Sequence, residues 1–155
     1  MKVFKFGGAS VKNAEGVKNV LTVLKTTEEK DLVVIVSAMG KMTNQLELII
    51  SNYFSSPNEV KASITEIYDF HFQIISDLFS NTSNPIFNLL LRYKNELHFF
   101  LENNKSNDHS FVYDQVVSFG ELISTSIISA YLSDKGLENK FLDVRSCIKT
   151  NTNYR

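Results

Sequence analysis

Cysteine is almost missing from this sequence, which has only Cys147 among its 155 residues. One cysteine cannot close a disulfide within the chain or form a cysteine-based zinc site. Such a composition is typical of a reducing compartment, where disulfides are rare. Because no histidine lies near it in the sequence, we expect Cys147 to be a small buried hydrophobe rather than a nucleophile.

An excess of charge of one sign is missing as well, since 16 Lys and Arg residues face 17 Asp and Glu residues, for a formal net charge of -1. No overall field therefore favours nucleic acid or an anionic membrane. The longest clean hydrophobic run, residues 32–36, is far shorter than the roughly 20 residues of a membrane span, and no signal-peptide run opens the chain. We expect a cytoplasmic protein that binds neither nucleic acid nor membrane.

What the sequence does have is enough for one globular domain. Its residues are 43% hydrophobic and 21% charged, without a low-complexity tract, which excludes a disordered chain. A chain of this length buries roughly two-thirds of its unfolded surface on folding, and it is too short for two ordinary domains.

The first forty residues predict a strand, a glycine turn, a helix and a second strand. Residues 2–6 are rich in β-forming residues and end at a pair of glycines, and apolar residues recur at helical spacing after Asn13, the expected N-cap. Residues 32–36 form a continuous run that is typical of a parallel strand covered on both faces. This order predicts a right-handed crossover and the α/β class.

The rest of the chain is mainly helical in pattern. Helices are expected from about residue 43 to 100, with Pro85 in the first turn of one of them, and again from about 112 to 133, ended by Gly136. Residues 140–144 are expected to form a third strand. About three strands for four or five helices make a narrow sheet, so we expect the chain to be part of something longer.

Two glycine-bearing loops, residues 7–10 (GGAS) and 37–40 (SAMG), follow the first two predicted strands. In a parallel sheet both lie at the carboxyl edge, where open α/β folds bind ligands. Glycine lets the backbone approach a phosphate, and Lys5 could add a positive charge. The alternative, a tight turn beside a solvated lysine, is the commoner use of a lone glycine pair.

Familiar phosphate-binding fingerprints do not fit these loops. A P-loop ending at Gly40-Lys41 needs glycine at position 35 and serine or threonine at position 42, where the sequence has Ile35 and Met42. A G-x-G-x-x-G pattern does not occur. Nucleotide binding would therefore need another architecture.

A carboxylate, Glu121, falls inside the long predicted helix, beside Gly120. At ~100° per residue it shares a side of that helix with apolar residues, namely Val117, Ile128 and Leu132. We therefore expect a buried carboxylate that needs a cation or hydrogen-bond donors. An internal ion pair, with Lys5 or Arg145, and contact with a ligand are left as equal alternatives.

The remaining polar candidates are weaker. The three histidines have no metal-ligand spacing, so no metal site is predicted; His71 fits a helix face and His109 a loop. Asp143 and Arg145 are expected to form a structural ion pair or to anchor a loop.

Three segments, in this order and spacing, resemble aspartate kinase: residues 5–11 (KFGGASV), 36–44 (VSAMGKMTN) and 118–124 (SFGELIS). The resemblance continues into residues 143–145 and 148–150 and spans the whole chain. It implies an amino-acid-kinase-like (carbamate-kinase-like) three-layer α/β/α sandwich. Residues 1–155 would be its N-terminal, aspartate-binding part, with a helical insertion at about 45–110 and without the nucleotide-binding half or the regulatory ACT domains.

The resemblance also implies roles for residues around the first loop. Lys5 corresponds to the lysine that contacts the ATP phosphates and stabilises the transferring γ-phosphoryl group. Gly7 and Gly8 match the loop whose backbone approaches those phosphates, together with Ala9 and Ser10. Ala9 stands where the family usually has threonine or serine, a change that we expect to be tolerated because the backbone does most of the cradling.

On the substrate side, the resemblance implies that the hydroxyls of Ser37 and Thr43 position aspartate and that Glu121 receives its amino group. The implied reaction is phosphoryl transfer from ATP, with Mg2+, to the β-carboxylate of L-aspartate. Its product is 4-phospho-L-aspartate, on the way to lysine, threonine and methionine. We expect a homo-oligomer, and we expect the 155-residue chain alone to turn over slowly or not at all.

Two alternatives stay open. Another amino-acid kinase, acting on glutamate or acetylglutamate, could share the glycine loop and the acid. A non-catalytic module that binds an amino acid or pairs with other subunits is also possible, because a narrow sheet leaves an unpaired edge.

Overall fold

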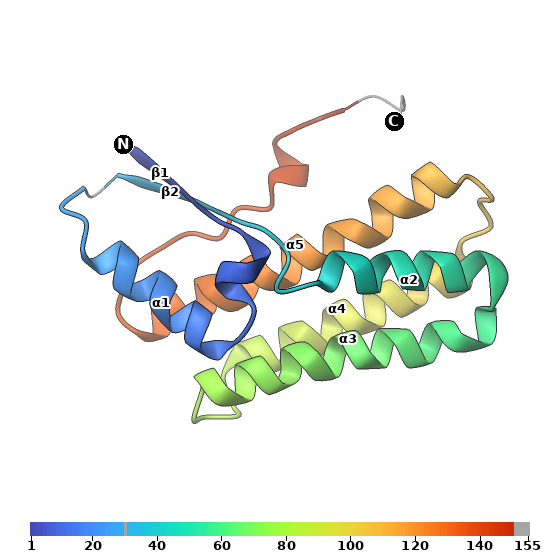
Figure 1. Cartoon of the computed structure of the whole chain (residues 1–155), viewed down its shortest axis with the longest axis horizontal. Coiled ribbons are helices and arrows are strands. Elements are labelled where there is room, and N and C mark those ends of the chain that lie inside the picture. Colours follow the sequence, from blue (N-terminus) through green and yellow to red (C-terminus); the bar gives the residue numbers. More distant parts are fainter. Residues whose placement is uncertain (30, 151–155) are drawn as a thin grey trace.

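A parallel strand pair and five long helices make up the part of the chain that the computed structural model describes, residues 1–29 and 31–150 (Figure 1). Strand β1 (Lys2–Phe6) pairs with β2 (Leu32–Val36), with Lys5 opposite Ile35. The 3-10 helix η1 (Gly8–Val11) and helix α1 (Ala14–Lys25) connect them. The Asn13 side chain accepts a hydrogen bond from the Gly16 N–H at 3.0 Å. The predicted strand–helix–strand order and the N-cap are confirmed.

Helices α2 (Met42–Ser55), α3 (Pro57–Leu78), α4 (Pro85–Asn103) and α5 (His109–Asp134) run alongside one another (Figure 1). Both prolines stand at helix starts, where a missing N–H costs no helical hydrogen bond. Gly136, with φ +77°, takes the left-handed conformation just after α5. The expected helices are confirmed.

The start of α5 differs from expectation because of its cap. The Asp108 carboxylate accepts hydrogen bonds from the N–H groups of Ser110 and Phe111 at 2.9 and 3.3 Å. This N-cap starts the helix at His109, which was expected in a loop.

Helix α5 lies at the centre of the core. By length and composition it could cross a membrane, but most of its apolar stretch is buried inside the protein. Its fully buried side chains include Val112, Val116 and Ile127. Packing against α2 and α4 therefore accounts for its hydrophobicity.

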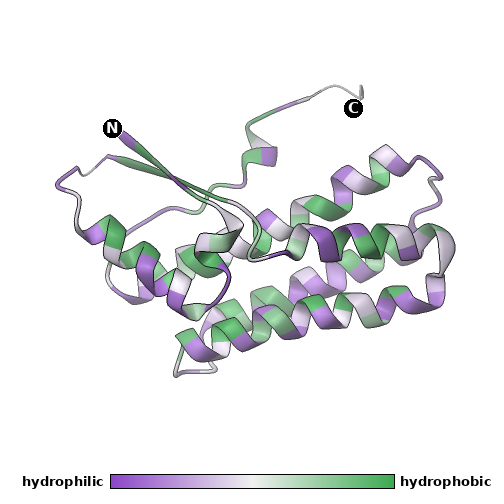
Figure 2. Cartoon of the chain, in the orientation of Figure 1, coloured by the Kyte–Doolittle hydropathy of each residue, from purple (hydrophilic) through white to green (hydrophobic). Residues whose placement is uncertain are grey.

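The strand pair is covered on one face only, which corrects the prediction of a doubly covered strand. Phe6 and Val36 belong to the core, whereas Val3, Val33 and Ile35 are 58%, 42% and 50% exposed. Figure 2 shows hydrophobic colour along both strands, and the alternation of side chains assigns part of it to the open face. The described residues supply no layer that covers this face.

The predicted third strand at residues 140–144 is wrong. Residues 137–143 have no regular structure, and a short 3-10 helix, η2 (Val144–Ser146), follows them. The Asp143 carboxylate accepts from the Arg145 N–H at 3.0 Å, so a local side-chain bond competes with extended pairing. Cys147, just after η2, is exposed rather than buried, because no part of the core covers this segment.

Candidate functional site

The loops after β1 and β2 are joined to each other by backbone hydrogen bonds. The Ser37 N–H donates to the Phe6 carbonyl at 3.0 Å, and the Gly40 N–H donates to the Gly8 carbonyl at 2.9 Å. A Cβ atom on Gly8 would lie 2.6 Å from the Ala38 oxygen and 2.8 Å from the Gly40 oxygen. Glycine is therefore required at position 8 for the packing of one loop on the other.

Gly7 has a different environment. Within 4 Å, a Cβ atom added there would meet Nζ of Lys5 alone, at 3.7 Å. The Lys5 side chain is exposed and lies beside the open backbone of the loop. The Cβ side of this half-buried glycine is therefore free of packed atoms other than the end of the Lys5 side chain, which brings a positive charge beside the loop. The next residues, Ala9 and Ser10, are exposed in η1.

Two further lysines lie around these loops: Lys12, which the sequence did not indicate, and Lys41, which entered the sequence analysis only through the rejected P-loop pattern. The Cβ of Lys12 is 3.7 Å from the position of a Cβ on Gly40, and Lys41 follows that glycine directly. Both are exposed, as Lys5 is. Lys12 is close to the loop after β2 only because the two loops pack together. Its position in the sequence therefore did not indicate that it lies at the site. Three cations around one corner favour an anionic ligand.

Ser37 and Thr43 lie on the two sides of the second loop. Ser37 is half-buried and follows β2 two residues after Ile35, so strand alternation assigns it to the open face that carries Lys5. Thr43 is half-buried in the first turn of α2, three residues before Leu46, which lies against α5 at Gly120. The helical spacing puts Thr43 on the side of α2 that faces α5.

Glu121 is exposed, which corrects the prediction of a buried carboxylate. On its side of α5, Val117 is only half-buried, whereas Ile128 and Leu132 are buried. The apolar side is therefore covered toward the end of the helix but open at Glu121. Within residues 1–29 and 31–150, the Glu121 carboxylate forms no salt bridge, with Lys5, Arg145 or another residue.

Arg145 instead pairs with Asp143, which confirms that predicted ion pair. Nη2 of Arg145 lies 2.7 Å from Oδ2 of Asp143, and the hydrogen bond from Arg145 lowers the pKa of the Asp143 carboxyl. Nη1 of Arg145 also donates to Oγ of Ser118 at 3.3 Å. The pair thus ties the segment after α5 back to that helix, one turn before Glu121.

Helix α5 touches the second loop at two points. The Ser124 hydroxyl donates to the Ser37 carbonyl at 2.8 Å. One turn earlier, a Cβ atom on Gly120 would lie 2.8 Å from the Cβ of Ala38. Glu121, Ser37 and Thr43 therefore come from three segments that meet at one corner, with Lys5 on the adjoining strand β1 and Gly7 in the loop after it. The described residues contain no group of three or more His, Cys, Asp or Glu side chains that could hold a metal ion.

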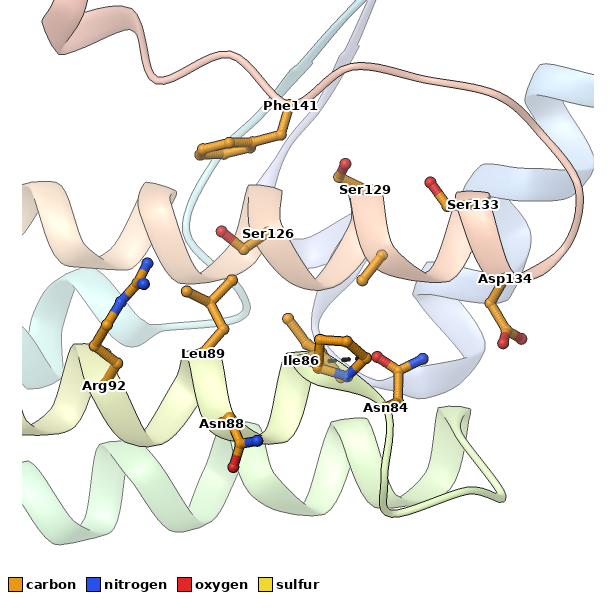
Figure 3. Close-up of a pocket in the computed structure, with 12 residues that line it drawn as sticks. Asn84, Ile86, Asn88, Leu89, Arg92, Ser126, Ser129, Ser133, Asp134 and Phe141 are labelled. Carbon is orange, nitrogen blue, oxygen red and sulfur yellow. Dashed lines mark hydrogen bonds between the residues drawn. The ribbon is translucent and has the colours of Figure 1, made fainter.

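A cavity of about 690 Å³ lies elsewhere, between α4 and α5. Figure 3 shows Ser129 and Ser133 on the side of α5 that faces the segment of Phe141, while Asn88 points away. Both serine hydroxyls are hydrogen-bonded to the Asn139 side chain. The cavity contains none of the predicted site residues, so the corner at the two loops is the candidate site.

Comparison with known proteins agrees with this fold. The model of the amino acid kinase family matches residues 1–155. Aspartokinase 1, chloroplastic, of Arabidopsis thaliana is 33% identical over 147 residues, covering 91% of this chain and 25% of that protein. The chain thus spans about a quarter of the length of this curated relative.

Two solved structures have the same fold over nearly the whole chain. E. coli aspartokinase III in complex with lysine and aspartate aligns with a TM-score of 0.85 at 25% identity, covering 98% of this chain and 33% of that one. The complex of the same enzyme with aspartate and ADP gives a TM-score of 0.82 at 25% identity, covering 97% and 33%. The predicted amino-acid-kinase-like α/β fold is confirmed.

Proposed function

Because the chain belongs to the amino acid kinase family, we propose that it carries the aspartate-binding part of an aspartate kinase, with residues 45–110 as a helical insertion. The observation that carries the proposal is the corner at the carboxyl ends of β1 and β2. There, Nζ of Lys5 stands beside the open backbone of Gly7, next to the loop and helices that bear Ser37, Thr43 and Glu121. The aspartokinase relatives, one of them solved with aspartate and ADP, support this choice of substrates.

On the phosphate side, we assign Lys5 and Gly7 the direct contacts. Lys5 would neutralise charge on the γ-phosphoryl group of ATP as it transfers, and the loop backbone from Gly7 to Ser10 would lie along the phosphates. Gly8 serves this loop indirectly, since its missing Cβ lets the two loops pack. Ala9 contributes backbone alone, so the proposal needs no hydroxyl at that position.

On the substrate side, the hydroxyls of Ser37 and Thr43 would bind the carboxylates of aspartate. The exposed Glu121 carboxylate, without an ion-pair partner among the described residues, would accept hydrogen bonds from its ammonium group. A buried, paired Glu121 could not do this without losing its partner. Exposure of this residue therefore favours ligand contact over the internal ion pair.

The reaction needs positioning more than proton transfer. An oxygen of the aspartate β-carboxylate bonds to the γ-phosphorus while the bond from that phosphorus to the oxygen bridging to ADP breaks. The nucleophile is already a carboxylate, so no general base is required. Mg2+ would supply charge neutralisation and arrive with the ATP phosphates, because the described residues hold no acidic cluster for it. The product, 4-phospho-L-aspartate, would lead toward lysine, threonine and methionine.

We further propose that the 155-residue chain alone binds aspartate but turns over slowly or not at all. Lys5 lies on the face of the strand pair that the described residues leave open to water. Water screens the charge interactions on which phosphoryl transfer depends. Rapid ADP release by the pure chain that requires both ATP and aspartate would contradict this proposal.

Isothermal titration calorimetry with L-aspartate, L-glutamate and N-acetyl-L-glutamate tests the substrate. We expect heat from aspartate alone, and at least about tenfold weaker binding in Glu121→Gln, since a charge-assisted bond is lost. Asp114→Asn, an exposed carboxylate on the same helix, is the matched control and should bind normally. Binding of glutamate or acetylglutamate instead would make the aspartate assignment wrong.

The phosphate side has its own matched pair on strand β1. Lys5→Ala should abolish most of the affinity for an ATP analogue, whereas Lys2→Ala should not, because Lys2 is also exposed but lies on the other side of the strand. Equal affinities in the two variants would remove Lys5 from the site.

One observation also favours pairing of subunits through the strand pair. Among the described residues β1 and β2 form a two-stranded sheet, so each strand has an outer edge without a strand partner, and pairing along such an edge leaves the face with Lys5 and Ile35 open. Sedimentation equilibrium of the chain should show dimers that Ile35→Lys disrupts. A monomer at all concentrations would contradict this second proposal and leave the kinase assignment untouched.

A further inference from the structure

Helix α5 makes two contacts with the loop between β2 and α2 that the roles proposed above do not use. Ser124 has no exposed surface, and its hydroxyl donates to the Ser37 carbonyl at 2.8 Å. Gly120 lies one helical turn before it and packs against the side chain of Ala38. Two successive loop residues are thus held from one face of one helix.

The bond from Ser124 differs from the commonest hydroxyl bond in the described helices. Several serines and threonines there donate to a carbonyl of their own helix four residues earlier, as Ser55, Ser76 and Thr65 do. Such back-bonding is the usual local choice for these side chains. Ser126 and Ser129, on the same helix as Ser124, bond to other side chains. Ser124 donates across to a segment 87 positions away, just past the end of β2. Its hydroxyl therefore stabilises a tertiary contact rather than its own helix.

Gly120 allows the same contact because it has no Cβ atom. An added Cβ would lie 2.8 Å from the Cβ of Ala38 and 3.0 Å from Cδ1 of Leu46. A contact of 2.8 Å between two carbon atoms does not persist, so any larger residue at position 120 would push the loop at Ala38 away from α5 and displace the end of the Leu46 side chain. Glycine in a helix interior is destabilising. We therefore attribute the presence of glycine at position 120 to the close approach of the loop to α5.

We propose that Gly120 and Ser124 are positioning residues for the aspartate site, an inference that rests on the function proposed above. They fix the distance between Glu121, which follows Gly120, and Ser37, whose carbonyl Ser124 holds. Gly120 also lies against the side chain of Leu46, which is about one turn after Thr43 on α2. The three groups that we assign to aspartate are therefore arranged before substrate arrives, and a small displacement would impair all three.

Ser124→Ala tests the hydroxyl, with Ser126→Ala as matched control. Ser126 is also buried on α5, at 5% exposure, and its hydroxyl is hydrogen-bonded to the Tyr93 hydroxyl at 3.1 Å rather than to the loop. Both variants lose one buried hydrogen bond and should lose similar stability. Ser124→Ala alone should raise the dissociation constant for aspartate about fivefold to tenfold, the equivalent of one hydrogen bond, and leave that for an ATP analogue unchanged.

Gly120→Ala should weaken aspartate binding more strongly than Ser124→Ala. The double variant Gly120→Ala/Ala38→Gly moves the methyl group from the loop to the helix and removes the 2.8 Å contact. It should recover most of the lost affinity. If the double variant binds as weakly as Gly120→Ala, or if Ser124→Ala and Ser126→Ala bind aspartate equally well, the positioning role is overturned.

Amide hydrogen exchange separates failure of this inference from failure of the proposed function. The N–H groups of Ser37 and Gly40 are bonded to Phe6 and Gly8, and their exchange reports the loop without any ligand. Ser124→Ala should speed it about fivefold or more relative to Ser126→Ala. If Ser124→Ala speeds the exchange but the chain binds no aspartate, the assignment of aspartate as substrate is wrong and the contact of Ser124 with the loop still stands. Unchanged exchange would refute the hold of Ser124 on the loop.

Discussion

The layer of helices α2–α5 and the strand pair β1–β2 bury their apolar residues to very different extents. Ile49, Ile75 and Ile127 in the helices have no exposed surface, whereas Ile35 in β2 is 50% exposed. The candidate site lies where these two regions meet, with Thr43 and Glu121 on the closed layer and Lys5 on the open strands. The proposed aspartate side of the site therefore lies on a well-packed core, whereas the proposed phosphate side lies on strands with one open face.

Replacing an isoleucine by alanine in each of the two regions should give the largest difference in the free energy of unfolding. Ile75→Ala should lower the free energy of unfolding by about 2–5 kcal/mol, because it leaves a cavity in the helical core. Ile35→Ala should lower it by no more than about 1 kcal/mol, because half of that side chain already contacts water. Urea denaturation measures both. Equal losses would mean that the strand face is covered in solution.

Acid should weaken the helical layer through His71. This side chain on α3 is fully buried; Nδ1 is bonded to the Ile67 carbonyl at 2.8 Å, and Nε2 has no hydrogen-bond partner among the described residues. Burial lowers the pKa of His71 from 6.5 to about 4. Between these values the unfolded chain binds more protons, so stability is complete above pH 6.5 and falls as the pH drops toward 4.

The expected loss in the free energy of unfolding is about 3 kcal/mol at pH 4, because the pKa of His71 falls from 6.5 to about 4 on folding. Urea denaturation between pH 4 and 7 measures it. His71→Leu should flatten this part of the profile, whereas His109→Gln, at an exposed histidine, should retain it. An unchanged slope in His71→Leu would assign the acid sensitivity to other groups.

The smallest expected effect is the loss of a helix cap, which should be the same in the two regions. Asn13 caps α1 beside the strands and Asn84 caps α4 in the helical layer, each accepting one backbone hydrogen bond at 3.0 Å. Asn13→Ala and Asn84→Ala should each lower the free energy of unfolding by about 1 kcal/mol, as measured by thermal denaturation. The two losses should agree, because a cap depends on local geometry. A much larger loss for Asn84→Ala would show that cap stability follows the surrounding core.

Local signals in the sequence predicted most of the helices and the core of the site. Asn13, Pro85 and Gly136 mark helix ends through conformational preferences that act within a few residues, and the structure confirms all three. The glycines after β1 and the lysine before them also lie together as expected. These features depend on neighbours in the chain, which the sequence shows directly.

Three errors have one common cause. Burial was predicted for Glu121 and strand pairing for residues 140–144 from apolar patterns, and burial of Cys147 from its residue type, yet Glu121 and Cys147 are exposed and residues 140–144 are unpaired. Periodicity shows which side of an element is apolar, but not whether another element covers it. A strand likewise needs a partner whose edge is free and near.

Sequence alone was enough to predict β1, β2, the five helices, their order and the chemical groups available to the site, because these depend on backbone preferences and side-chain chemistry. Tertiary structure alone decided that Gly8 serves packing while Gly7 stays open, and that Glu121 is unpaired in the described chain. It also decided that Ser124 holds Ser37 across 87 positions. Close contacts between residues far apart in the chain follow from how the whole core packs, and no local pattern encodes them.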